Sequence, residues 1–148
     1  MVPAQSARAV AVALLLAVPA RAQLQPEARA ELARAAESRA ELGIGASFRI
    51  GLYVRGALSV ARDVWRSADT SAATRAEYLM RFTLDPLAEQ RWAVSFGGGV
   101  GYRERAYLLA VAELEGPRHA GLRPALQFSL GGGTRLGFVL RRAVKGRR

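Results

Sequence analysis

Large apolar residues alternate with small or charged ones from residue 39 onward, and this period of two constrains the fold most strongly. In the clearest segment the large residues share one face and are Trp92, Val94, Phe96, Val100 and Tyr102. The positions between them are small and are Ala93, Ser95, Gly97, Gly99 and Gly101. Successive side chains of a strand point to opposite faces, whereas a helix would scatter each set around its circumference. The alternation therefore predicts strands.

Turn signals divide this region into seven predicted strands. Asp85-Pro86, Gly116-Pro117 and Gly131-Gly132-Gly133 are the clearest turns, and Arg103-Glu104 suits a tight turn. The predicted strands cover residues 40–48, 50–61, 75–84, 91–102, 105–115, 122–131 and 134–142. The polar segment Asp63–Thr74 is the one longer loop. Strands of about 9–12 residues exceed the usual five or six of soluble domains and match the 9–11 that cross a bilayer at a tilt.

The second face of these strands carries Gly, Ala and Ser with scattered arginines, which suits the inside of a narrow barrel. Arginines in such a lumen can pair with Glu77, Glu113 or Glu115. Trp92 and Tyr102 lie at opposite ends of one strand, as aromatic girdles at two membrane interfaces require. Closure removes unpaired strand edges. We predict an all-β fold, a small antiparallel up-and-down β-barrel over residues 39–142.

The first residues have the features of an export signal. Arg8 supplies a positive charge, the apolar run Ala9–Val18 follows, and Ala20-Arg21-Ala22 places small residues at the positions a signal peptidase reads. The apolar run is about half the roughly 20 residues that a membrane-spanning helix needs. We predict a signal peptide over residues 1–22.

Residues 23–38 form a leader rich in Ala, Glu and Arg. Pro26 suits a first helical turn, and Glu27 and Glu31 suit the positive end of a helix dipole. We predict a short helix or a disordered leader here. Bacterial barrels have an even number of strands, so the count of seven leaves three alternatives. The leader supplies an eighth strand, one strand is divided wrongly, or the barrel stays open.

The signal peptide, the lack of cysteine, the glycine-rich alternating strands and the tight turns together resemble the small outer-membrane β-barrel proteins of diderm bacteria. The resemblance covers roughly residues 39–142. It implies an outer-membrane location, with outer-membrane lipid or lipopolysaccharide and an envelope protein as partners. We predict a non-enzymatic structural or interaction role at the cell envelope. The alternatives are a soluble periplasmic β-barrel or sandwich that binds an apolar ligand, and a lipid-modifying envelope enzyme.

Composition narrows the chemistry further. The chain has no cysteine, which excludes disulfides, thiolate metal sites and a cysteine nucleophile. Its net charge of +10 would suit nucleic acid, but export from the cytoplasm argues against that partner. The single histidine, His119, lies in a turn, ten residues from the nearest serine, Ser129, and is expected to be solvated. The glycine clusters lack the ending of a phosphate-binding loop.

The acids of the predicted loops, which are Asp63, Asp69, Asp85 and Glu89, show no calcium-loop or acid–base spacing. We therefore assign no catalytic, cofactor-binding or metal-binding residue.

The C-terminal segment is strongly basic, and residues 143–148 form a basic tail. Its candidate lipid-binding residues are Arg141, Arg142, Lys145, Arg147 and Arg148. We predict that they contact anionic lipid headgroups or lipopolysaccharide phosphates by charge pairing. The alternative is a solvated, disordered terminus.

Overall fold

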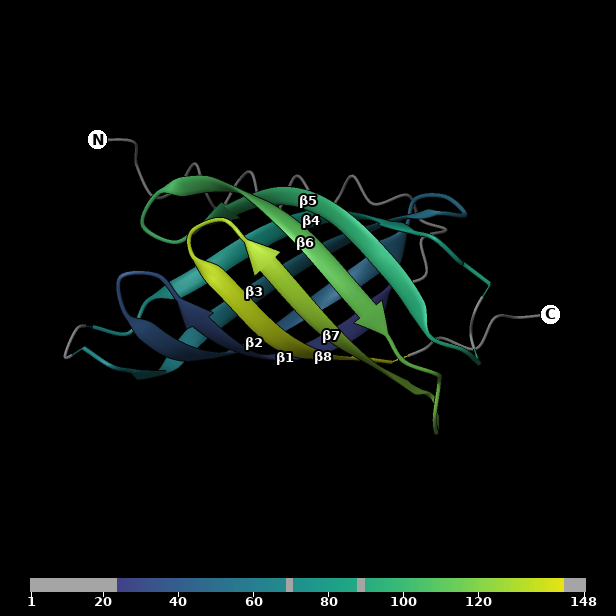
Figure 1. Ribbon diagram of the computed structural model, residues 1–148, viewed down its shortest axis with the longest axis horizontal. Coiled ribbons are helices and arrows are strands. Elements are labelled where there is room, and N and C mark those ends of the chain that lie inside the picture. The colour runs from purple at the N-terminus through teal and green to yellow at the C-terminus, as the bar shows by residue number, and fades with distance from the viewer. Residues whose placement is uncertain (1–23, 69–70, 88–89, 143–148) are drawn as a thin grey trace.

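The chain folds into one closed barrel of eight antiparallel strands (Figure 1). This computed structural model describes residues 24–68, 71–87 and 90–142. The strands are β1 (Gln25–Arg34), β2 (Ser38–Arg49), β3 (Val54–Arg66), β4 (Thr74–Thr83), β5 (Ala93–Tyr102), β6 (Ala106–Glu115), β7 (Leu122–Leu130) and β8 (Thr134–Arg142). No helix in these three ranges is long and apolar enough to cross a membrane.

Each strand pairs with the next along the chain, and β1 pairs with β8 to close the ring. The predicted antiparallel up-and-down barrel is therefore confirmed, with eight strands. We call the end where β1 begins and β8 ends the terminal end; it also holds the loops 50–53, 84–92 and 116–121, and lies where the β6 arrowhead points in Figure 1. The opposite end, here the far end, holds residues 35–37, 67–73, 103–105 and 131–133.

The eighth strand comes from the leader, and the helix predicted over residues 23–38 is wrong for Gln25–Arg34. Alanine, glutamate and arginine favour helices in isolation. Here β1 lies between β2 and β8, so ladder hydrogen bonds on both sides outweigh that local preference. The predicted signal peptide, residues 1–22, lies outside the described residues.

The predicted loop Asp63–Thr74 is also shorter than expected, because β3 continues to Arg66. The Asp63 carboxylate turns inward and accepts the backbone N–H of Ala73 at 3.0 Å. The pairing of β2 with β3 shifts register between Ala40 and Glu41, where β3 carries an extra residue. The end of β3 was therefore not predicted, because its sequence is polar and lacks regular alternation.

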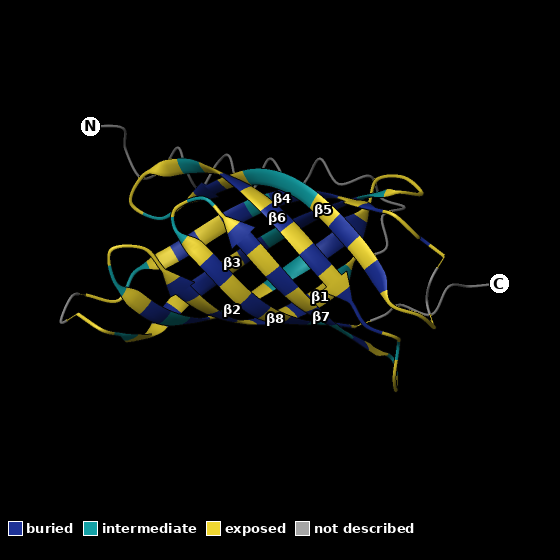
Figure 2. Ribbon diagram, viewed as in Figure 1, coloured by how far each residue is buried: buried dark blue, intermediate teal, exposed yellow. Residues whose placement is uncertain are grey.

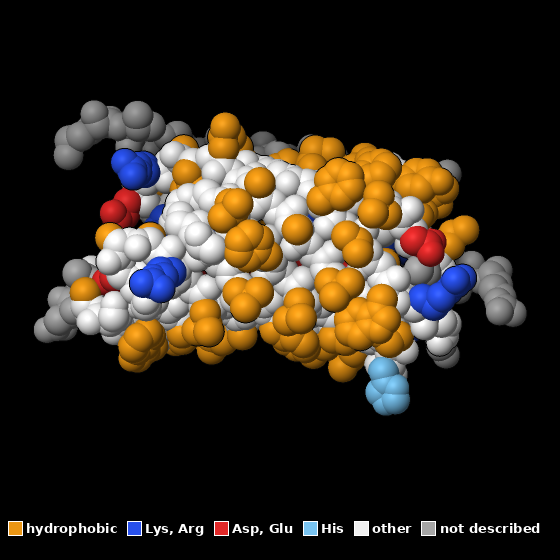
Figure 3. All heavy atoms as spheres, viewed as in Figure 1, with side chains coloured by type: hydrophobic (Ala, Val, Ile, Leu, Met, Phe, Trp, Pro, Cys, Tyr) orange, Lys and Arg blue, Asp and Glu red, His pale blue; other side chains and the backbone are white. Residues whose placement is uncertain are grey.

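Burial alternates along most of the strand positions, with interruptions at the start of β3 and at Gly97–Gly99 of β5 (Figure 2). The predicted strands therefore have the two faces that their sequence indicates. Around the barrel wall the apolar residues are exposed and the charged ones are buried, the reverse of a water-soluble fold. On the face drawn in Figure 3, hydrophobic side chains cover the wall and charged side chains gather at the two ends.

Two glycines of β5 allow its close approach to β4. A Cβ built on Gly97 would lie 2.0 Å from the carbonyl oxygen of Met80, and one on Gly99 would lie 1.9 Å from that of Tyr78. The hairpin glycines Gly131, Gly132 and Gly133 all have positive φ, which confirms the predicted turn. Curvature and turn geometry therefore account for both glycine clusters.

Candidate functional site

The outer wall is an apolar surface with aromatic residues near both ends. Trp92 is 63% exposed at the terminal end of β5, and Tyr102 is 58% exposed at its far end. The rings of Tyr53 and Phe82 stack with centroids 5.6 Å apart. Such a wall, with amphipathic rings at each rim, matches the hydrocarbon core and the two interfaces of a bilayer.

The lumen is filled by charged side chains that pair with one another. Among the described residues, eight arginines and seven carboxylates are buried. The arginines are Arg29, Arg39, Arg55, Arg75, Arg81, Arg123, Arg135 and Arg141. The carboxylates are Glu27, Glu31, Glu41, Asp63, Glu77, Glu113 and Glu115. The near balance of charge matters, because an unpaired ion in this interior would cost several kcal/mol.

The terminal-end cluster centres on Arg141. Its Nε donates to Glu27 Oε1 at 2.5 Å, and its Nη1 donates to Glu113 Oε1 at 2.6 Å. Arg81 bonds to the same two carboxylates, Glu113 at 2.5 Å and Glu27 at 3.2 Å. Glu115 joins the cluster through Arg141 at 3.5 Å, and Arg123 lies 3.0 Å from Glu115 on its other side. Two guanidinium groups therefore hold a pair of carboxylates between them.

The far-end cluster centres on Arg75. Its guanidinium lies 2.6 Å from Glu31, 2.8 Å from Glu41 and 2.7 Å from Glu77. Glu77 also accepts Arg135 Nη2 at 2.6 Å. One arginine therefore joins carboxylates from three strands, β1, β2 and β4.

Arg29 joins the two clusters, because it lies 2.9 Å from Glu27 and 3.5 Å from Glu31. An unbroken series of ion pairs, each with N–O separations of 2.5–3.5 Å, then runs the length of the lumen. Its members in order are Arg123, Glu115, Arg141, Glu27, Arg29, Glu31, Arg75, Glu41, Arg103 and Asp63. We call it the lumen ion-pair series.

One side of the lumen is apolar. Ala57, Leu79, Leu109 and Val111 pack together there, and Tyr107 packs against them. The Tyr107 hydroxyl donates to Glu77 Oε1 at 2.9 Å, so this residue links the apolar cluster to the charged one. Its ring also fills the space beside a glycine, Gly101, where a Cβ would lie 2.3 Å from the ring.

Tyr107→Phe is expected to lower the free energy of unfolding by about 1–3 kcal/mol, because it removes the hydrogen bond that the hydroxyl donates to the charged carboxylate of Glu77. Tyr107→Ala should cost more, since the ring over Gly101 is lost as well. Urea unfolding in detergent micelles, followed by tryptophan fluorescence, measures both. A phenylalanine variant as stable as the parent would contradict the role of the hydroxyl.

The structure confirms the predicted pairing of lumen arginines with Glu77, Glu113 and Glu115. The contributions of Glu27 and Glu31 do not follow from the prediction of a short helix or a disordered leader over residues 23–38. The spacing Glu27-x-Arg29-x-Glu31 puts all three side chains on one face of a strand, a signal that the sequence does contain.

The structure places the predicted lipid-contacting residues in different environments. Arg141 is 1% exposed and held in the lumen, so its guanidinium is not available to a headgroup. Arg142 is exposed at the terminal end of β8. Lys145, Arg147 and Arg148 lie outside the described residues, as does the whole predicted tail, 143–148.

The other candidates stand apart from one another. His119 is exposed in the β6–β7 loop at the terminal end, whereas Ser129 is buried near the far end of β7 and accepts Arg135 Nε at 3.4 Å. Asp63 is a lumen residue, and Asp85 accepts the backbone N–H of Leu87 at 3.3 Å. Asp69 and Glu89 lie outside the described residues. Within the described ranges, no cluster of His, Cys, Asp or Glu could hold a metal ion.

Comparison with known proteins agrees with this geometry at the level of fold. The barrel resembles the solution NMR structure of the de novo designed protein TMB2.3, a designed transmembrane β-barrel, with a TM-score of 0.65 and 12% sequence identity. The match covers 84% of this chain and 95% of the designed one. No protein-family model matches the sequence, and no curated protein matches it. The chain therefore has a membrane-type β-barrel fold.

Proposed function

We propose that this protein is a non-enzymatic barrel of the bacterial outer membrane with a structural or interaction role at the cell envelope. One observation carries the proposal: exposed apolar side chains surround a lumen packed with paired charges. Contact of that apolar wall with water would cost a large free energy, whereas contact with hydrocarbon would not. The signal-like features of residues 1–22 support export across the inner membrane.

The lumen argues against a channel as the role. An eight-stranded barrel has an interior just wide enough for side chains, and porin-like channels need about sixteen strands. Here the lumen ion-pair series and the cluster around Leu79 occupy that interior. We expect the purified barrel to give no porin-like conductance in a planar bilayer.

The far end offers a fixed surface for a partner. Arg66 donates to the carbonyl oxygen of Ser71 and lies 2.9 Å from Glu37, so the β3–β4 loop is tied to the β1–β2 turn. The Ser67 N–H also donates to the Ser38 carbonyl at 2.9 Å. A surface held in this way suits contact with another envelope protein at low entropic cost.

Expression in a diderm host followed by density separation of the membranes tests the location. We expect the protein in the outer-membrane fraction, with a gel mobility that changes on heating. A variant without residues 1–22 should stay inside the cell and serves as the control. A parent that remains soluble and monomeric without detergent would overturn the proposal.

The alternative of a periplasmic barrel that binds an apolar ligand is less well supported, because the interior is charged and the large apolar side chains lie outside. A lipid-modifying enzyme would need a nucleophile beside a base. His119 and Ser129 lie at opposite ends of β7, which does not suit that pair.

A further inference from the structure

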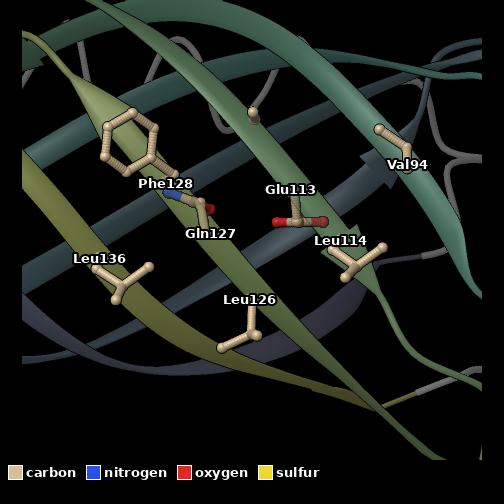
Figure 4. Close-up of a pocket in the computed structure, with 8 residues that line it drawn as sticks. Val94, Glu113, Leu114, Leu126, Gln127, Phe128 and Leu136 are labelled. Carbon is tan, nitrogen blue, oxygen red and sulfur yellow. The ribbon is translucent and has the colours of Figure 1, made fainter.

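The outer wall carries an apolar depression of about 260 Å³ over β5–β8 (Figure 4). Its lining residues are Val94, Ala112, Glu113, Leu114, Leu126, Gln127, Phe128 and Leu136. The side chains of Glu113 and Gln127 are buried, so the surface offered outward is almost wholly apolar. Ala112 is the shortest outward side chain of the set, and it leaves the floor open between Leu114 and Phe128.

Two aromatic side chains pair in register with Ala112: Phe128 on β7, which lines the depression, and Phe96 on β5, which does not. Phe96 on β5 pairs with Ala112 on β6, but its ring packs against Phe82 of β4, with centroids 5.7 Å apart. Phe82 stacks in turn on Tyr53. The Phe96 ring is thus held toward β4, and the depression over Ala112 stays open beside Phe128.

Beyond the depression, toward the terminal end, the wall becomes basic and aromatic. Arg142 pairs in register with Leu122, and Phe138, four residues back along β8, pairs with Leu126 at the edge of the depression. At about 3.3 Å per residue of strand, Arg142 lies roughly 13 Å past that edge. Arg91 lies at the same end, two residues before β5 begins. Both arginines are exposed.

Trp92 lies between these arginines and the depression. A Cβ on Gly116 would lie 3.5 Å from the Trp92 ring, so the indole stands beside the β6–β7 loop at the rim. Exposed tryptophan at this depth is typical of a membrane interface, where its N–H reaches polar headgroup atoms.

We propose that this face binds one anionic phospholipid, with an acyl chain in the depression over Ala112 and the phosphate between Arg91 and Arg142. The proposal rests on the proposed membrane location. The distance along β8 from the depression to Arg142 is comparable with half of the roughly 30 Å hydrocarbon core, the depth of one leaflet. Guanidinium groups pair with phosphate through two hydrogen bonds, which favours arginine in this position.

Native mass spectrometry of the full chain, released from micelles with equal amounts of phosphatidylglycerol and phosphatidylcholine of identical chains, tests the charge contact. We expect more bound phosphatidylglycerol, by about fivefold for each arginine near the headgroup. Arg91→Gln with Arg142→Gln should reduce that preference to near parity. Arg34→Gln, an exposed arginine at the far end, is the matched control and should leave the preference unchanged.

Ala112→Leu tests the acyl contact, because its side chain fills the depression. We expect it to lower the binding of both lipids, whereas Ala76→Leu, at an outward alanine of β4, should not. Equal binding of the two lipids by the parent, or full binding by Ala112→Leu, would overturn the lipid site. A parent that shows no heat-modifiable folded form would instead contradict the membrane barrel itself, so the two failures are distinguishable.

Discussion

Arg141→Met is expected to lower the free energy of unfolding by about 3–5 kcal/mol, the usual cost of removing one partner from a buried ion pair. Arg141 is fully enclosed and bonds to both Glu27 and Glu113. Without it, Arg81 alone would bridge those two carboxylates, so one guanidinium instead of two would offset their mutual repulsion. Urea titration of the folded barrel in detergent, read by gel mobility without heating, measures the loss.

Arg142→Met is the matched control for this loss, since Arg142 follows Arg141 in β8 but is exposed on the outer wall. It should change stability by less than about 0.5 kcal/mol, as surface substitutions usually do. Replacing Glu113 and Arg141 together by methionine should recover part of the loss, because the pair is then removed without leaving one ion behind. An Arg141→Met barrel as stable as the parent would refute the ion-pair account of the lumen.

Gly99→Ala is expected to cost about 3 kcal/mol or more, the upper range for overpacking, and to lower the yield of folded barrel. Its Cβ would lie 1.9 Å from the carbonyl oxygen of Tyr78 and 3.0 Å from the Cα of Leu79. Both are backbone atoms, so relief requires β5 to move away from β4 and lose ladder hydrogen bonds. The heat-modifiable fraction after refolding, together with urea unfolding, reports the effect.

Gly51→Ala provides the comparison, because nothing lies within 4 Å of a Cβ at that position. It should leave stability unchanged or raise it by up to about 1 kcal/mol through the unfolded state. Equal folding of the two alanine variants would show that β5 does not need its close approach to β4.

Sequence alone was sufficient for the barrel class and for the two faces of its strands, but it left the strand count and the closure open. Between Arg75 and Leu84, and again from Trp92 to Tyr102, large apolar residues alternate with small or charged ones, and that alternation depends only on strand geometry. The strand Gln25–Arg34 remained one of three alternatives, because seven of its ten residues are alanine, glutamate or arginine, all good helix formers. One of its two partners is β8, at the other end of the chain, which no local pattern reveals.

The lumen could be predicted in kind but not in detail. The sequence indicates that arginines meet Glu77, Glu113 and Glu115, but the particular partners depend on the register of all eight strands. Arg141 illustrates the limit: it belongs to a basic run that predicts a lipid contact, yet a side chain one position from the exposed Arg142 points the opposite way.

The lumen ion-pair series places a condition on how this barrel can assemble. Glu27, Arg29 and Glu31 come from the first strand, and Arg141 comes from the last. Until those strands meet, the ion pair between Arg141 and Glu27 cannot form, so each of them lacks one of its counter-ions, and placing an incompletely paired charge in hydrocarbon costs several kcal/mol. An open, membrane-inserted sheet is therefore unfavourable, and the two chain ends must stay in a polar environment until they pair. Entry into the bilayer and joining of the first and last strands are consequently expected to occur as a single concerted step.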